Sequence, residues 1–316
     1  MQITRSQTID LLKKANDIVI TAHVNPDGDA IGSSLGLMHY LKTLNKKVTM
    51  FIDDDIPANF SVLPGFDEIK RVPEVPYKAD LLVILDTSLD RVGTVREIVS
   101  APVLNIDHHI SNNNQADYLY LDATRAATAE IVFQLLKDMD AFISLDIALC
   151  IYTGIATDCG FFRFSNTSSF TMYAAGELID AGVKPNIISE ALEQKPFLTI
   201  KSISRAINTL EMFHDGKIAG VFLSKEDMEF CDSTEGFIDF VRIIEGVDVA
   251  VLAKYVEEGI CRVSMRSKYT DVSKIAMMFG GGGHIRAAGC TIHKSLTETK
   301  DQIIAAIINA MEKQNE

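Results

Sequence analysis

The sequence of 316 residues is poor in cysteine and contains no Cys-x-x-Cys pair, which argues against a structural zinc ribbon. Its thiols are odd in number, scattered, and mostly set in apolar runs: Cys150, Cys159, Cys231, Cys261 and Cys290. A disulfide framework of a small secreted protein does not fit this pattern. We therefore expect reduced, buried thiols in a cytoplasmic protein.

Long apolar runs are also missing. No stretch reaches the roughly 18 apolar residues that a membrane-spanning helix needs. The first residues, Met-Gln-Ile-Thr-Arg-Ser-Gln-Thr, lack the apolar core of a signal peptide. We expect no membrane partner. The apolar fraction of 47% is enough to fill the cores of two domains of ordinary size.

Clusters of basic residues are absent as well. The sequence has 30 Lys and Arg residues and 43 Asp and Glu residues, which give a net charge of −13. Proteins that clamp long duplexes through phosphates usually carry a basic stripe. We therefore expect no long duplex partner. Any nucleic-acid ligand should be short, and held by metal ions and a few arginines. The acidity also serves solubility, independently of any ligand.

The most informative stretch that is present runs from residue 18 to residue 34. An apolar run, Ile18–Ile20, is followed within a turn by His23, Asp27 and Asp29, and then by a predicted helix from Ala30 to Leu44. Imidazole together with clustered carboxylates is a ligand set for divalent Mn, Zn or Fe. The alternative is a polar loop in which the Asp residues only cap the helix.

Similar polar groups follow other predicted strands. We expect strands at about 17–22, 47–52, 80–86 and 102–106, and the third is apolar throughout its interior, as in a parallel sheet buried on both faces. The third strand ends at Asp86, and the fourth is followed by Asp107, His108 and His109. A predicted helix, 145–158, ends at Asp158. Because ligands bind at the carboxyl edge of such sheets, we expect a shared metal site there.

The remaining pattern predicts an α/β protein with two domains. The predicted helices in the first part are 6–16, 124–139 and 168–182, and a helical stretch from 185 to 211 is broken near Pro196. In the second part we expect strands near 217–223, 247–256 and 259–267, and helices at 236–244, 271–278 and 296–313. We predict a metal-binding domain at 1–190, a helical linker at 191–212, and a smaller domain with a mixed sheet at 213–316.

The second part carries its own candidate residues for binding an anion. Alternation along a strand places Arg262, Ser264 and Arg266 on one face, where guanidinium and hydroxyl groups suit phosphate. For Arg262 a solvated position is an equal alternative. The run Gly280–Gly283, followed by His284, lets backbone N–H groups approach an anion, although it matches neither a Walker loop nor a Rossmann fingerprint.

Taken together, these residues resemble the motifs of the DHH phosphoesterases, a resemblance that spans nearly the whole chain. The chain is most similar to the NrnA-type members, which degrade very short oligoribonucleotides (nanoRNA) and dephosphorylate 3'-phosphoadenosine 5'-phosphate (pAp). The matching motifs are His23-Val-Asn-Pro-Asp27-Gly-Asp29, Asp86-Thr-Ser, Asp107-His108-His109, Asp158 after Thr153-Gly-Ile-Ala-Thr, and Gly280-Gly-Gly-Gly-His284. The resemblance implies a doubly wound, mainly parallel N-terminal sheet and a DHH-associated C-terminal domain.

The resemblance also implies a centre of two divalent ions, with Mn²⁺ as the leading candidate and Mg²⁺ or Co²⁺ as substitutes. In such a centre, a water molecule between the ions attacks phosphorus in line. One ion would be held by His23, Asp27 and Asp86. The other would be held by Asp29, Asp86, His108 and Asp158, so that Asp86 bridges the two.

The chemistry and position of further residues, together with the same resemblance, suggest their roles. His109 would act on the scissile phosphate or protonate the leaving oxygen, or else only support its neighbour, and Asp107 would orient an imidazole. Ser264, Arg266, the glycines Gly281–Gly283 and His284 would bind substrate, in a cleft between the domains that favours short RNA. For Arg163 a contact with the nucleotide and a structural role are equal alternatives.

Several alternatives remain open at this stage. The substrate could instead be a linear or cyclic dinucleotide such as pApA or cyclic di-AMP. A non-catalytic nucleotide-binding module is the alternative from another class of protein, although such a module would usually lose metal ligands and this sequence retains them. The sequence does not fix the direction of RNA degradation, the native metal or the oligomeric state, and a homodimer is compatible with it.

Overall fold

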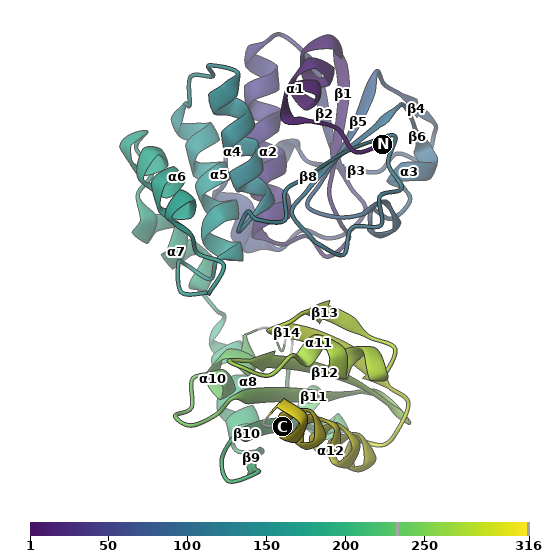
Figure 1. Ribbon diagram of the computed structural model, residues 1–316, viewed down its shortest axis with the longest axis vertical. Coiled ribbons are helices and arrows are strands. Elements are labelled where there is room, and N and C mark those ends of the chain that lie inside the picture. The colour runs from purple at the N-terminus through teal and green to yellow at the C-terminus, as the bar shows by residue number, and fades with distance from the viewer. Residues whose placement is uncertain (232–233, 235, 315–316) are drawn as a thin grey trace. The chain divides into compact units, whose positions relative to one another are not determined.

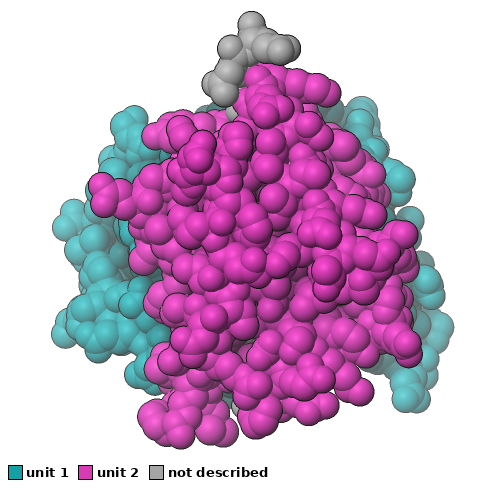
Figure 2. Space-filling view, turned by 90° about the horizontal axis from the view of Figure 1, so that it is seen from below, with its two compact units in different colours: residues 1–194 teal, residues 195–316 magenta. Residues whose placement is uncertain are grey.

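A computed structural model of the protein describes residues 1–231, 234 and 236–314. The chain divides into two compact units, residues 1–194 and residues 195–316, which Figure 2 shows in different colours. All five cysteines are free thiols, and four of them are buried. Among the residues that the structure describes, no helix has both the length and the apolar character needed to cross a bilayer.

The first unit contains a parallel sheet, helices on both of its faces, and short 3₁₀ turns (Figure 1). Its elements are α1 (Arg5–Lys14), β1 (Asp17–Thr21), α2 (Gly28–Thr43), β2 (Lys47–Ile52), η1 (Ala58–Val62), η2 (Phe66–Glu68), β3 (Lys70–Arg71), β4 (Tyr77–Lys78), β5 (Leu81–Leu85), η3 (Leu89–Arg91), α3 (Val95–Ile98), β6 (Val99–Ser100), β7 (Val103–Asp107), β8 (Tyr118–Leu121), α4 (Thr128–Asp138), α5 (Leu145–Asp158), α6 (Ser169–Asp180) and α7 (Pro185–Glu193).

The main sheet of residues 1–194 has six strands in the order β3-β2-β1-β5-β7-β8, and all neighbouring pairs are parallel. The predicted parallel α/β architecture is therefore confirmed. β1 pairs with β2 on one side and with β5 on the other, so the winding direction reverses between β1 and β5. The carboxyl ends of strands at such a reversal form the crevice in which α/β proteins bind ligands.

Both faces of this sheet are buried, which explains its nearly continuous apolar strands. Ile18 and Ile20 of β1 face the large core under α2, α4 and α5, which lie side by side in Figure 1. Val19 points to the opposite face, where it packs with Val95 of α3 and other apolar residues. Each fully buried Ile or Val contributes about 1.5–3 kcal/mol by leaving water, so the two cores hold the strand ends in place.

Helices α2 and α5 approach each other closely through glycine. A Cβ atom added to Gly32 of α2 would lie 2.4 Å from the carbonyl oxygen of Cys150 and 2.7 Å from the backbone nitrogen of Gly154. Only a residue without a side chain allows this contact. The contact brings Asp29, in the first turn of α2, alongside α5, the helix that ends at Asp158.

The helix boundaries predicted in this unit lie within two residues of the observed ones, with one larger difference. The helix expected from residue 124 begins at Thr128, four residues later. Asp122 accepts hydrogen bonds from the backbone N–H and the hydroxyl group of Thr124, which stabilises a turn instead of a helix. The N-terminus of α4 is therefore placed where another carboxylate, that of Asp29, can reach it.

The second unit contains a mixed sheet between two layers of helices. Its elements are α8 (Phe197–Ile207), β9 (Leu210–Phe213), β10 (Ile218–Leu223), α9 (Lys225–Met228), α10 (Phe237–Arg242), β11 (Val249–Glu257), β12 (Ile260–Ser267), α11 (Val272–Met278), β13 (Gly282–His284), β14 (Ala287–Ile292) and α12 (Leu296–Gln314). In the described part of this unit, the strand order is β13-β14-β12-β11-β10-β9, in which only β10 and β11 are parallel neighbours.

The side chains of β11 point alternately to the two faces of the sheet, and each face packs against its own layer of helices. Val249 and Val251 pack with α11 and α12, whereas Ala250 and Leu252 pack with α8 and α10. Helix α8, which lies in the range expected as a linker, contributes Ile203 to this second core. It therefore packs as part of the unit.

Three strands of this sheet were not foreseen. Residues 210–213 belong to β9, which pairs antiparallel with β10, although the predicted helix extended to residue 211. The glycine run forms the edge strand β13, paired with β14. The small residues of β14 carry a weak strand signal. The structure nevertheless buries Ala288, Cys290 and Ile292 in its core.

Candidate metal centre

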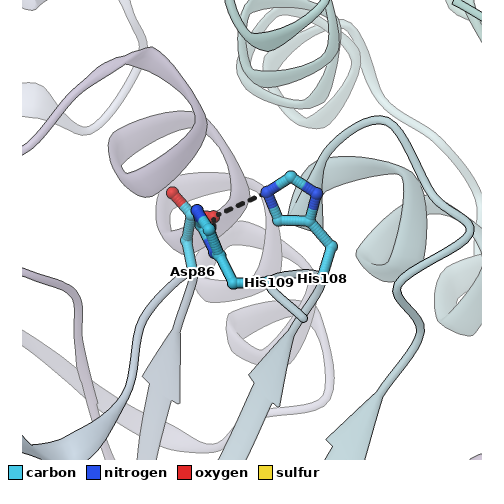
Figure 3. Close-up of side chains that lie close together, drawn as sticks. All are labelled: Asp86, His108 and His109. Atoms are coloured by element: carbon cyan, nitrogen blue, oxygen red, sulfur yellow. Dashed lines mark ion pairs between the residues drawn. The ribbon is translucent and has the colours of Figure 1, made fainter. Parts of the chain in front are cut away.

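Six predicted ligand side chains come from four places at one edge of the first sheet. His23, Asp27 and Asp29 follow β1, Asp86 follows β5, His108 follows β7, and Asp158 is the last residue of α5. Figure 3 shows Asp86, His108 and His109 converging above the ends of their strands. Ligand atoms lie within 4.8 Å of one another in each of three groups, namely His23–Asp27–Asp86, Asp29–His108–Asp158 and Asp86–His108–His109.

Asp86 lies at the centre of this arrangement. Its side chain is 2% exposed, and its two oxygens face different partners. Oδ2 is 3.7 Å from Nε2 of His23, and Oδ1 is 3.5 Å from Nε2 of His108. Its backbone has φ of +62°, a left-handed conformation that costs a residue with a Cβ atom about 1–3 kcal/mol. Such strain is typical of functional sites, and here it accompanies a carboxylate directed between two imidazoles.

His23 and Asp27 face the Oδ2 side of Asp86. The Nδ1 atom of His23 lies 2.8 Å from the carbonyl oxygen of Val24, so that Nδ1 carries the proton and Nε2 is directed toward the carboxylates. Oδ1 of Asp27 caps α2 by accepting from the N–H groups of Asp29 and Ala30. The other oxygen of Asp27 lies 3.7 Å from Nε2 of His23. Asp27 therefore caps α2 with one oxygen and directs the other toward His23.

His108 provides the strongest sign that this cluster fits a cation. Its Nδ1 is 3.2 Å from the carbonyl oxygen of Arg125, which fixes the tautomer. Its Nε2 is buried and, among the described residues, has no hydrogen-bond partner. Three carboxylates, those of Asp29, Asp86 and Asp158, lie 3.5–4.0 Å from this nitrogen. A buried nitrogen that lies beyond hydrogen-bond distance of the surrounding oxygens fits a divalent ion between them.

Asp29 and Asp158 complete the group of donors around His108. Asp29 is 1% exposed, and its two oxygens accept from the backbone N–H groups of Thr128 and Ala129 at 2.6 and 2.8 Å. The N-terminus of α4 thus offsets part of its charge. Asp158 lies at the C-terminus of α5, where the helix dipole opposes a carboxylate. A bound cation would compensate this charge.

The electrostatics of the cluster agree with a cation site. Burial raises the pKa of Asp29 well above its ordinary value, with the nearby charges of Asp86 and Asp158 adding to the shift. Burial likewise raises the pKa of Asp158 to about 7. Although burial opposes their charged forms, contacts with carboxylates raise the pKa of His23 to about 10 and that of His108 to about 9. Protons on these groups balance the negative charge in the way that bound ions would.

Asp107 and His109 form a separate pair beside this cluster. Asp107 is fully buried and accepts from Nδ1 of His109 at 2.8 Å and from the backbone N–H groups of His108 and His109. Its other oxygen accepts from the side chain of Asn112. With these partners Asp107 orients His109. Nδ1 of His109 also lies 3.7 Å from Oδ1 of Asp86.

In the second unit, the predicted substrate residues Ser264, Arg266 and His284 lie along one face of the sheet. On β12, Val263 and Met265 point into the core with α11 and α12, so Ser264 and Arg266 point to the opposite face. Burial lowers the pKa of Arg266, and its Nη1 donates to the carbonyl oxygen of Met265. The guanidinium group is thus held close to the sheet.

Cross-strand pairing extends this face to the glycine strand. Arg266 lies opposite Ala287, which lies opposite His284, and Ser264 lies opposite Gly289, which lies opposite Gly282. Directly opposed residues share a face, so small residues separate Arg266 from His284. A Cβ atom on Gly283, where φ is +139°, would lie 2.5 Å from the carbonyl oxygen of Ala287. Gly281 is similarly tight, 2.2 Å from the carbonyl oxygen of Gly289.

The residues that surround the predicted ligands were not recognisable from the sequence. Thr128, Asn166 and Asn112 contact the ligands or the segments that carry them, yet none is an acid or a histidine. Asn112 and Asn166 lie close to the motifs in the sequence, whereas no sequence pattern pointed to Thr128. Arg163 donates from Nε to the carbonyl oxygen of Gly160, which is a contact within its own turn.

Two His and four Asp side chains gather at the edge where the winding of a parallel sheet reverses, an arrangement typical of α/β proteins that bind divalent metal ions. Residues 17–155 match the model of the DHH family N-terminal domain, and residues 179–313 match the DHHA1 domain. The chain belongs to the DHH family. The motifs that carry the predicted metal ligands lie in or directly after the first matched region, and the glycine-rich strand β13 lies in the second.

Relatives similar to the chain over most of its length agree with this assignment. A bifunctional oligoribonuclease and PAP phosphatase NrnA from Thermus thermophilus is 34% identical over 92% of the chain and 89% of the relative. The protein of the same name from Bacillus subtilis is 27% identical over 95% and 96%. A crystal structure of an exopolyphosphatase-related protein from Bacteroides fragilis has a TM-score of 0.86 and 26% identity, covering 98% of this chain and 95% of that one.

Proposed function

We propose that this protein is a divalent-metal-dependent phosphoesterase that hydrolyses short oligoribonucleotides and pAp. The observation that carries the proposal is the grouping of donor atoms around Asp86, in which His23 and Asp27 face one oxygen while His108 faces the other. The names of the relatives from Thermus thermophilus and Bacillus subtilis support the choice of substrates. The free thiols support a cytoplasmic location.

Two ions fit the donor set. His23, Asp27 and Asp86 would hold one ion, and Asp29, Asp86, His108 and Asp158 the other. Because oxygen donors dominate, Mn²⁺ is the favoured ion, with Mg²⁺ or Co²⁺ as substitutes. When bound, a pair of such ions activates water and stabilises the charge of an in-line displacement at phosphorus.

The protein's own residues hold these groups in place and handle a proton. Asp86 is positioned by its strained backbone, and the carbonyl oxygens of Val24 and Arg125 orient His23 and His108. Asp107 holds Nδ1 of His109, so any proton exchange between His109 and a substrate has to use Nε2. Asp107 also stabilises the protonated imidazole, as a general acid requires.

We further propose that the β12–β14–β13 face of the second unit binds a phosphate or nucleotide. Arg266 and Ser264 supply charge-assisted and neutral hydrogen bonds. The glycines Gly281, Gly282 and Gly283 give access to backbone N–H groups, and His284 lies beside them on the exposed edge strand.

Replacing Arg266 with alanine should raise KM or lower turnover by roughly ten- to a hundredfold, because a charge-assisted hydrogen bond is worth ~1.5–3 kcal/mol. Metal content should not change, since Arg266 belongs to the other unit. Steady-state kinetics with pAp and metal analysis of the purified variant test this. Lys300→Ala, which removes a charge from α12 on the opposite face of the sheet, is the control. Equal kinetics for Arg266→Ala and wild type would show that Arg266 does not bind the substrate.

The net charge of −13 supports a preference for short substrates, because every phosphate that projects beyond the site meets an acidic surface. Initial rates with Mn²⁺ on RNA of about 5 and about 24 nucleotides at equal concentration decide this. We expect the short RNA to be degraded roughly tenfold faster, with attack only from an end. Equal rates, or cleavage of a circular RNA, would contradict the proposal.

A wider substrate panel separates the remaining functions. It contains pAp, pApA, cyclic di-AMP and pyrophosphate beside the two RNAs. A clear preference for pApA or cyclic di-AMP would identify a dinucleotide phosphodiesterase. Full metal loading without turnover of any of these compounds would identify a binding module instead of an enzyme.

A further inference from the structure

The segment from Arg125 to Glu130, which we call the ligand clamp, contacts three of the six predicted ligand side chains, those of Asp29, Asp86 and His108. It comprises the turn before α4 and the first residues of that helix. The carbonyl oxygen of Arg125 orients His108, and the backbone N–H groups of Thr128 and Ala129 bind Asp29. The clamp therefore contacts ligands that are brought together from two different loops.

Within the clamp, Thr128 is the residue that contacts two ligand carboxylates directly. Its backbone N–H donates to Oδ2 of Asp29 at 2.6 Å, and its hydroxyl group donates to Oδ1 of Asp86 at 3.0 Å. Thr128 is fully buried. The hydroxyl group thus selects one oxygen of Asp86, the one that also faces His108, and leaves the other oxygen directed toward His23.

Further bonds fix the clamp in its place. The side chain of Asn166 donates to the carbonyl oxygens of Ala126 and Asp158, both at 3.2 Å, and so ties the clamp to the end of α5. Glu130, which is also fully buried, accepts from the backbone N–H of Ala126. The position of Thr128 is therefore determined from both sides, which is what a residue needs if it is to orient others.

We propose that Thr128 is a positioning residue that sets the orientation of the Asp86 carboxylate for binding of the divalent ions. The proposal rests on the metal centre of the proposed function. The hydroxyl group holds Asp86 so that its two oxygens point to the two groups of donors. Without this hydroxyl group, the carboxylate of Asp86 rotates about its terminal bond. The affinity for the ion on the His108 side then falls most.

The test compares three variants of the full-length protein after removal of metal. Thr128→Val removes the hydroxyl group, keeps the shape and keeps the backbone N–H bound to Asp29. Thr128→Ser keeps the hydroxyl group. Thr8→Val is the matched control, because Thr8 is likewise a buried threonine of the first unit, with a hydroxyl group that donates only to the carbonyl oxygen of Thr4. Isothermal titration with Mn²⁺ gives the number of sites and their dissociation constants, and thermal unfolding reports on the fold.

Thr128→Val should weaken Mn²⁺ binding about 10- to 100-fold, the usual effect of losing a partner of a metal ligand. Thr128→Ser and Thr8→Val should stay within about threefold of wild type. Wild-type affinity for Mn²⁺ in Thr128→Val would overturn the proposal. An equal loss of affinity in Thr128→Ser would also overturn it, because Thr128 would then act through the packing of its side chain and not through its hydroxyl group. If Thr128→Val fails to fold, Thr128→Ala is titrated in its place under the same criteria. A wild type that binds no Mn²⁺ would instead contradict the proposed metal centre.

Discussion

Replacing Asp86 with alanine should remove both divalent ions and lower turnover at least about a thousandfold. The side chain lies between His23 and His108 and is the one carboxylate that faces both groups of donors among the described residues. Ions of this kind supply several kcal/mol of transition-state stabilisation, and each ~1.4 kcal/mol is a factor of ten in rate. Metal analysis of the purified variant and turnover of pAp at saturating Mn²⁺ measure the two effects.

Asp17→Asn is the control for this variant. Asp17 belongs to β1 but lies at the opposite end of that strand, where it pairs with the exposed Lys47. Its replacement should leave activity and metal content within about twofold of wild type, because exposed ion pairs contribute at most about 1 kcal/mol. Asp29→Ala should mainly weaken one ion. Full metal content and full activity in Asp86→Ala would show that the two-ion assignment is wrong.

Replacing His109 with glutamine should lower turnover by about a hundred- to ten-thousandfold, the range expected for a general acid or base. Glutamine preserves the polarity of the site but exchanges no proton near neutral pH. The number of bound Mn²⁺ ions should not change. Single-turnover cleavage of pAp, together with metal titration, distinguishes a chemical role from a role in metal binding.

Two further variants sharpen this prediction. His39→Gln is the matched control, since His39 lies in the same unit and its ring contacts only the carbonyl oxygen of Pro64 among the bonds described. Asp107→Asn removes the charge that supports His109 and should lower turnover in the same direction by a smaller factor. Loss of an ion in His109→Gln would identify His109 as a ligand, as its place in the Asp86–His108–His109 group also allows.

The sequence was sufficient to predict the sheet and the ends of its central strands. Strands buried on both faces are apolar throughout, and a run such as Leu81–Leu85 stops abruptly at a polar residue. Parallel strands bring these stops to the same edge, so Asp86 and His108 are close in space although 22 positions separate them in the sequence. Regular geometry therefore made this part of the site predictable.

The surroundings of those side chains could not be predicted in the same way. The contacts of Thr128 with Asp29 and Asp86 join residues that are 99 and 42 positions apart, and they depend on where α4 begins. The sequence pattern placed the start of α4 at residue 124. The carboxylate that caps α4 comes from α2, so no residue directly before the helix marked its true start. The strands β13 and β14 were missed for a related reason. Their glycines and alanines are fixed by partner strands, not by local propensity.

The capping of α4 by Asp29 also bears on how the charge of the buried acids is compensated. Zinc fingers remain unfolded until metal neutralises their ligands. Here Asp29 receives two backbone hydrogen bonds and Asp86 receives one from the hydroxyl group of Thr128. These bonds offset part of the repulsion among the acids while the helices α2, α4 and α5 assemble. Unlike a zinc finger, the first unit therefore compensates part of the charge of its buried acids with hydrogen-bond donors of its own chain.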